Sequence, residues 1–184
     1  MNLLFLTCVF PLLGWFLLAF SRGRFSENLS SLIGVGSVGL SALTAAWVIM
    51  QFNLNPPPNG VFTQVLWQWM SVACFAPSFT LYLDGLSLTM LGVVTGVGFL
   101  IHLFASWYMR GEEGYSRFFA YTNLFIFSML LLVLGDNLLV LYFGWEGVGL
   151  CSYLLIGFYF KHTANGNAAL KAFIVTRIGD VFMA

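Results

Sequence analysis

The amino-acid sequence predicts an all-α integral membrane protein of about six transmembrane helices, the last of them truncated, with a small periplasmic β-hairpin between the second and the third. Three observations predict this fold class. Hydrophobic residues make up 60% of the 184 residues and charged residues only 8%, against about 25% charged in a soluble domain. The apolar residues fall into runs of about 20 residues, the length that crosses a bilayer. One long loop carries prolines and then strand-like alternation.

The composition excludes several other classes of protein. Seven basic and seven acidic residues cancel, so no basic field is present to attract nucleic acid. The three cysteines, Cys8, Cys74 and Cys151, form no CxxC motif and no cluster with histidine. We therefore expect no disulfide framework, no metal site and no nucleic-acid partner.

The apolar runs define the expected spans, which cover residues 2–20, 31–51, 85–109, 118–135, 138–160 and 167–184. The first run is interpreted as a permanent span and not a signal peptide, because its positive charges, Arg22 and Arg24, follow the apolar stretch. No internal repeat or linker is visible, so residues 1–184 are expected to form the N-terminal part of one membrane domain.

The basic residues predict the orientation of the chain. Six of the seven fall in, or at the edge of, the first, third and fifth connections, and these are Arg22, Arg24, Arg110, Arg117, Lys161 and Lys171. Lys and Arg accumulate on the cytoplasmic side of a membrane. The N-terminus is therefore expected on the periplasmic side.

The outer loop, residues 52–84, is expected to hold the hairpin. Residues 56–58 are prolines, which stop a helix, and the segments 67–69 and 79–83 then alternate as strands do. We predict a β-hairpin over residues 62–83, and an irregular interfacial loop held by Trp67 and Trp69 is the alternative. Asp84 is expected to cap the following helix.

Three ionisable residues lie inside spans and are the candidate functional residues: Glu146, Arg177 and Asp180. A charge within the bilayer is costly and therefore a functional candidate. At about 1.5 Å per residue, Glu146 lies about 12 Å from the outer end of its span and Asp180 about 20 Å from the inner end of its own. Both therefore lie near the middle of the membrane, which suits a lateral proton path.

Each candidate also has a structural interpretation. Glu146 lies among Gly144, Gly147 and Gly149, and these glycines permit close helix packing around an acid held in a salt bridge. Arg177 and Asp180 are three residues apart and can simply pair within one helix; alternatively, Asp180 is coupled to Glu146 or to a lysine outside this chain.

Two further ionisable residues are expected to have structural roles. Lys171 is expected to extend its side chain towards the inner interface. His102 is expected to be a hydrogen-bonded packing residue.

Several motifs in one order resemble the subunit L (chain 5) family of proton-pumping NADH:quinone oxidoreductase, respiratory complex I. They are residues 84–90 (DGLSLTM), 115–121 (YSRFFAY), 144–149 (GWEGVG), 154–158 (LLIGF) and 171–180 (KAFIVTRIGD). The resemblance covers essentially the whole chain. It implies an antiporter-like membrane domain with the N-terminus in the periplasm.

The resemblance also implies roles for the candidate residues. Glu146 matches the family's proton-carrying glutamate, which pairs with a lysine in a later span, and Asp180 and Arg177 match an aspartate and its neighbouring arginine. The implied partners are other membrane-arm subunits, the lipid bilayer and protons. The family's FMN, iron–sulfur clusters and quinone belong to other subunits, so no cofactor is expected in this chain. The bacterial inner membrane is the expected location, and the mitochondrial inner membrane is the alternative.

The expected function is that of a membrane subunit of NADH:quinone oxidoreductase, which carries protons through Glu146 while quinone is reduced elsewhere in the complex. The large subunit of a multisubunit cation/proton antiporter is the alternative. A third interpretation is a structural membrane subunit whose buried charges only fix helix packing.

Overall fold

The computed structural model describes residues 1–69 and 76–183. Within them the elements are α1 (Leu4–Ser21), α2 (Glu27–Leu54), the short 3₁₀ helix η1 (Pro58–Gly60), β1 (Phe62–Gln68), β2 (Ser78–Leu83), α3 (Gly85–Tyr108), α4 (Tyr115–Leu134), α5 (Leu138–Ile156) and α6 (Thr163–Met183). Among these residues, the five helices α1 to α5 are long and apolar enough to cross a membrane. The predicted fold class is confirmed.

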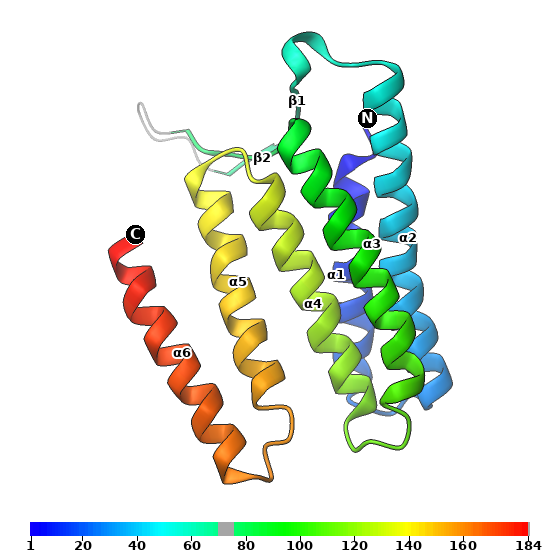
Figure 1. Cartoon of the computed structure of the whole chain (residues 1–184), viewed down its shortest axis with the longest axis vertical. Helices are drawn as coiled ribbons and strands as arrows, with labels where there is room; N and C mark the ends of the chain where they lie inside the picture. The colour runs from blue at the N-terminus through cyan, green and yellow to red at the C-terminus, as the bar shows by residue number, and fades with distance from the viewer. Residues whose placement is uncertain (70–75, 184) are drawn as a thin grey trace.

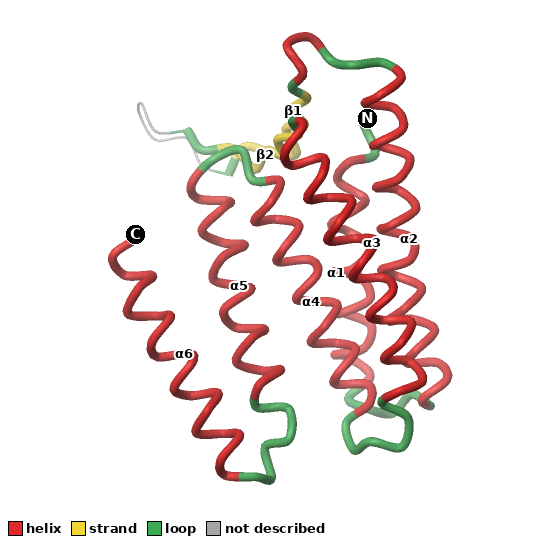
Figure 2. The backbone as a smooth tube through the Cα atoms, in the orientation of Figure 1, coloured by secondary structure: helices red, strands yellow, loops and turns green. Residues whose placement is uncertain are grey.

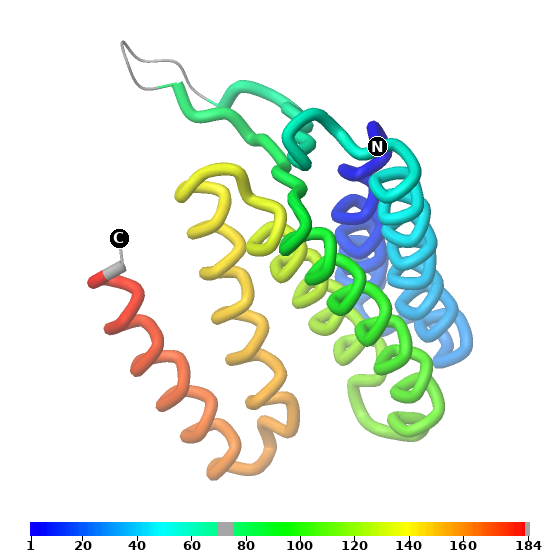
Figure 3. Tube along the Cα trace, turned by 45° about the horizontal axis from the view of Figure 1, so that its top comes forward, coloured from blue at the N-terminus to red at the C-terminus, as the bar shows by residue number. Residues whose placement is uncertain are grey.

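The helices form a bundle with α4 at its centre (Figure 1). Helix α4 packs against α1, α2, α3 and α5, whereas α6 lies at one edge and packs chiefly on α5. The α1–α2, α3–α4 and α5–α6 connections lie at one end of the bundle (Figures 1 and 3). The two strands and the α4–α5 turn lie at the other end (Figure 2).

Several helix ends differ from the ends of the apolar runs in the sequence. Helix α2 begins at Glu27 and not at residue 31, because the hydroxyl of Ser26 caps it by accepting a hydrogen bond from the backbone N–H of Leu29. Helix α6 begins at Thr163 and not at residue 167, and α5 ends at Ile156, before residue 160. Hydropathy marks the residues that lie in lipid, whereas a helix ends where its backbone groups find other partners.

The two strands form an antiparallel sheet, as the alternation in the sequence predicted. Phe62 pairs with Leu83, and Gln68 pairs with Ser78. The rings of Trp67 and Phe79 stack with their centroids 4.5 Å apart, a cross-strand pair of the kind that stabilises small sheets. The predicted turn of the hairpin falls on residues 70–75, which lie outside the described residues.

The predicted cap at the start of α3 is confirmed. An oxygen of the Asp84 carboxylate accepts a hydrogen bond of 2.8 Å from the N–H of Ser87, and the Ser87 hydroxyl accepts one of 2.8 Å from the N–H of Asp84. This reciprocal arrangement is a capping box. The hydrogen bond from the Ser87 backbone to the charged carboxylate is the main cause that lowers the pKa of Asp84.

Candidate functional site

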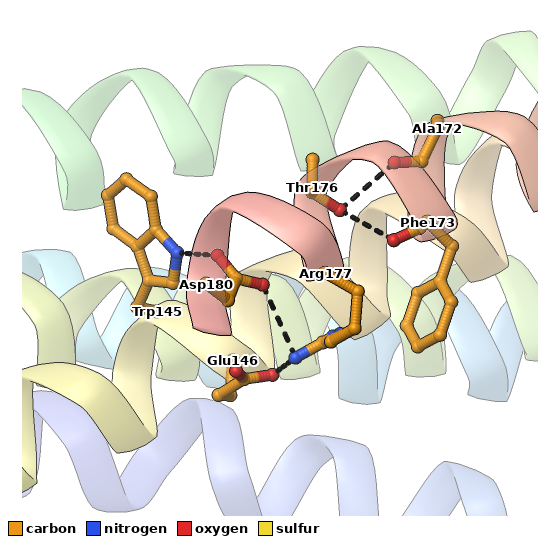
Figure 4. Close-up of polar contacts among 7 residues, drawn as sticks. All are labelled: Trp145, Glu146, Ala172, Phe173, Thr176, Arg177 and Asp180. Carbon is orange, nitrogen blue, oxygen red and sulfur yellow. Dashed lines mark hydrogen bonds and ion pairs between the residues drawn. The ribbon is translucent and has the colours of Figure 1, made fainter. Parts of the chain in front are cut away.

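The three predicted site residues meet in one cluster between α5 and α6 (Figure 4). Glu146 projects from α5, and Arg177 and Asp180 project from α6. The Nη1 atom of Arg177 forms an ion pair with Oε2 of Glu146 and a second one, at 3.5 Å, with Oδ2 of Asp180. The predicted pair within the helix is therefore present, and the same guanidinium also joins the two helices.

Glycines on two faces of α5 position Glu146. A Cβ atom on Gly144 would lie 2.5 Å from the backbone nitrogen of Leu132, so α5 and α4 touch at this glycine. On the side towards α6, a Cβ atom on Gly149 would lie 3.4 Å from Nη2 of Arg177. The glycines thus let α5 pack closely on α4 and leave room for the guanidinium next to Glu146.

Two aromatic residues that the sequence analysis did not single out complete the cluster (Figure 4). The indole Nε1–H of Trp145 donates a hydrogen bond of 2.7 Å to Oδ1 of Asp180. The guanidinium carbon of Arg177 lies 4.5 Å from the centroid of the Phe173 ring, a cation–π contact. A tryptophan beside an intramembrane acid was the available sequence signal, because an indole N–H away from water needs an acceptor.

The charges of the cluster do not balance when both acids are ionised. Asp180 is 6% exposed, while the side chains of Glu146 and Arg177 are 26% and 30% exposed. Two carboxylates and one guanidinium sum to one net negative charge, which is unfavourable away from water. Binding of one proton would make the charge of the cluster zero.

Two cavities border this cluster. Glu146 and Arg177 line one of about 460 Å³, whose remaining walls are mostly apolar and include Phe127 and Phe143. Trp145 and Asp180 line a second cavity of about 580 Å³ between α4, α5 and α6. Glu146 and Asp180 therefore line different cavities, and the guanidinium of Arg177 forms an ion pair with both carboxylates.

The remaining ionisable residues of the spans lie apart from this cluster. His102 is 3% exposed, and its Nδ1 atom lies 2.8 Å from the carbonyl oxygen of Gly98, which agrees with the expected packing role. Lys171 is exposed and forms no ion pair within residues 1–69 and 76–183. In the same described ranges, no group of three or more His, Cys, Asp or Glu residues is arranged to hold a metal ion.

Two family models match parts of the chain. Residues 69–119 match the N-terminus of chain 5 of NADH-ubiquinone oxidoreductase (complex I). Residues 135–184, which include the whole cluster, match the transmembrane region shared by NADH:quinone oxidoreductase and the Mrp antiporter.

Bacterial relatives resemble the chain over its full length. It is 78% identical over 184 residues to NADH-quinone oxidoreductase subunit L of Pseudomonas aeruginosa, and 67% identical over 184 residues to that of Escherichia coli. These matches cover 100% of this chain and 30% of each relative. The chain therefore spans about 30% of the length of the curated relatives, and it matches their N-terminal part.

Solved structures share the fold at low sequence identity. An archaeal membrane-bound sulfane sulfur reductase has a TM-score of 0.80 at 18% identity and covers 99% of this chain and 35% of its own. The Mrp complex of Dietzia has a TM-score of 0.71 at 24% identity and covers 95% of this chain and 18% of its own. At these identities the likeness concerns the fold alone.

Proposed function

We propose that this chain is part of a proton-carrying membrane subunit in which Glu146 binds and releases the proton. The premise is that the whole chain matches the N-terminal part of proteins named NADH-quinone oxidoreductase subunit L. The observation that carries the proposal is that two carboxylates share the one guanidinium of Arg177 next to two cavities. Such a cluster stores one exchangeable proton.

The partners of the two acids favour Glu146 as the residue that exchanges the proton. Asp180 is held by both the Trp145 indole N–H and Arg177, and hydrogen bonds to a carboxylate favour its charged form. Glu146 has Arg177 as its ion-pair partner and is more exposed than Asp180. When Glu146 takes up a proton, Asp180 still compensates the positive charge of Arg177.

In this proposal the subunit lies in a bacterial inner membrane with its N-terminus in the periplasm, among the other membrane-arm subunits of the complex. Electron transfer from NADH to quinone takes place elsewhere in the complex, in subunits that carry FMN and iron–sulfur clusters. The high identity to proteins named subunit L supports this choice over a free-standing cation/proton antiporter. The interpretation as a structural subunit makes a different prediction for substitutions of Glu146.

Replacing Glu146 by glutamine tests the proposal. An Asp or Glu in the middle of the bilayer costs roughly 2.5–3.5 kcal/mol on insertion scales, and Gln keeps the size of Glu but does not titrate. In the full-length protein within its complex, we expect Glu146→Gln to assemble normally and to lower proton pumping by roughly tenfold or more. We expect Glu146→Asp to retain part of the activity. The measurements are quinone-dependent NADH oxidation and proton uptake in membrane vesicles, with assembly followed on native gels.

The matched control is Glu113→Gln, which makes the same chemical change in the exposed α3–α4 loop, where Glu113 pairs with Lys161. Exposed ion pairs contribute little, so this variant should pump normally. A Glu146→Gln enzyme that assembles and pumps as well as the Glu113→Gln enzyme would show that Glu146 has only a packing role.

A further inference from the structure

A separate cavity of about 630 Å³ lies near the C-terminal end of α1. It is bordered by that end of α1, the start of α2 and the start of α4. Trp15, Leu18 and Phe25 contribute its apolar lining, while Arg22 and Arg117 contribute positive charge. Among its lining residues, Trp15 alone also lines a cavity of the Glu146 cluster. Its volume lies in the range typical of small-molecule sites.

The N-terminus of α4 opens onto this cavity without a side-chain cap. Its N-cap residue is Gly114, in a left-handed conformation with φ of 88°, and no side chain of the described residues caps the first turn by accepting a hydrogen bond. Gly114, Tyr115, Ser116 and Arg117 all line the cavity. The N–H of Tyr115 donates a hydrogen bond of 3.2 Å to the carbonyl oxygen of Glu112, so within the described residues the N–H groups of Ser116 and Arg117 are the free donors of this turn. These donors and the positive end of the dipole of this 20-residue helix favour an anion here.

Two buried hydroxyl groups without hydrogen-bond partners provide an independent observation at the same place. Ser30 is 0% exposed and Ser116 is 8% exposed, and both residues line the cavity. Neither hydroxyl has a hydrogen-bond partner among the described residues. Buried polar groups are almost always paired in folded proteins, so two unpaired hydroxyls beside one cavity indicate a polar ligand there.

The charged lining residues are mixed in sign. Arg22 and Arg117 are balanced by Glu27 and Glu112, so the four charges sum to zero. The carboxylate of Glu27 already accepts a hydrogen bond of 3.2 Å from the N–H of Gly111, whereas Glu112 forms no ion pair within residues 1–69 and 76–183. The guanidinium of Arg117 is held by the ring of Phe160, 4.9 Å from its carbon. A ligand with one anionic and one cationic group matches this lining.

We propose that this cavity binds the headgroup of a zwitterionic aminophospholipid. The phosphodiester lies between Arg22, Arg117 and the N-terminus of α4, where it also accepts hydrogen bonds from the Ser30 and Ser116 hydroxyls. The ammonium group lies beside Glu112, and the glycerol and acyl chains follow the apolar wall. The cavity lies at the end of the bundle that carries the loops with Arg22, Arg24 and Arg110 (Figure 1), which is the level of headgroups in a membrane.

Native mass spectrometry of the full-length protein in detergent tests this proposal. The delipidated protein is titrated separately with phosphatidylethanolamine, phosphatidylglycerol, free phosphoethanolamine and inorganic phosphate. We expect one phosphatidylethanolamine to be retained more tightly than phosphatidylglycerol. We expect Arg22→Gln to weaken its retention by about tenfold or more, the scale of one charge-assisted hydrogen bond. Ala19→Phe, which places a ring in the cavity from an exposed position of α1, should abolish retention.

Two matched controls separate this site from general lipid attraction. Arg24→Gln removes the same charge from the same loop but does not line the cavity, so it should retain the lipid as wild type does. Glu112→Gln should remove the preference for phosphatidylethanolamine over phosphatidylglycerol, whereas Glu113→Gln should not. Equal loss in Arg22→Gln and Arg24→Gln, or undiminished retention in Ala19→Phe, would overturn the site. Equally tight binding of free phosphoethanolamine or phosphate would assign it to a soluble ligand instead of a lipid.

Discussion

At the scale of single residues, Arg177 connects the two intramembrane acids, because its guanidinium forms an ion pair with each of them. A single arginine can neutralise only one carboxylate, so the other is left with a charge that the bilayer disfavours. A locked salt bridge needs only one acid and one base, and the second acid of the cluster is the feature that supports the proposed proton exchange. The second acid makes proton binding the simplest way to reach neutrality.

Trp145 is expected to influence which acid holds the proton. Its N–H donates the 2.7 Å hydrogen bond to Asp180, and a hydrogen bond contributes about 0.5–1.5 kcal/mol net. Trp145→Phe keeps an aromatic ring but loses the donor, so Asp180 competes with Glu146 for the proton. We expect proton pumping to fall by about three- to tenfold, a smaller loss than in Glu146→Gln, with normal assembly on native gels.

Trp107→Phe is the control for the loss of an indole. Trp107 lies on α3, is 73% exposed and forms no part of the cluster, so its replacement should leave pumping unchanged. If vesicles with Trp145→Phe pump at the same rate as vesicles with Trp107→Phe, the hydrogen bond to Asp180 has no role in proton transfer.

At the scale of helices and strands, most of the architecture could be predicted from local patterns. Apolar runs located the spans, alternation located β1 and β2, and the cap at Asp84 followed from its side chain and spacing. These features depend on neighbours within a few residues of the chain. The exact helix ends did not follow, because Ser26 and similar caps act outside the apolar runs.

The candidate site was only partly predictable for the same reason. The spacing of Arg177 and Asp180 places both on one face of α6, which the sequence alone determines. The ion pair of Arg177 with Glu146 depends on how α5 and α6 are rotated towards each other, and an estimate of depth in the membrane contains no information on rotation. The bond from Trp145 to Asp180 depends on the same rotation.

The close packing of α5 on α4 is expected to depend on Gly144. A Cβ atom there would lie 2.5 Å from a backbone nitrogen of α4, and a backbone cannot move aside as a flexible side chain can. We expect Gly144→Ala to destabilise the protein by about 1–3 kcal/mol and to lower its thermal unfolding temperature in detergent. It should also reduce pumping, because the displaced α5 carries Glu146.

Gly96→Ala is the corresponding control within α3, where a Cβ atom would meet no atom from the rest of the described chain, outside its own helix turn, within 4 Å. Alanine favours a helix over glycine, so this variant should be as stable as wild type or slightly more stable. Equal unfolding temperatures for Gly144→Ala and Gly96→Ala would show that α4 and α5 are not in close contact at this glycine.

At the scale of the whole molecule, the charged loops predict how the bundle lies in the membrane. The connections that carry Arg22, Arg24, Arg110 and Lys161 share one end of the bundle, and the sheet lies at the other (Figure 1). Basic loops remain on the cytoplasmic side, so the sheet is expected on the periplasmic side.

Labelling of single cysteines tests this orientation. In a chain with the native cysteines replaced, the Thr63→Cys variant, whose position is exposed in β1, should react with an impermeant maleimide in intact cells. A cysteine at Arg24→Cys should react only after the membrane is permeabilised, and this second reaction also shows that the position is accessible. The opposite labelling pattern would show that the bundle has the inverted orientation in the membrane. The proposed lipid site at the start of α4 would then lie in the outer leaflet.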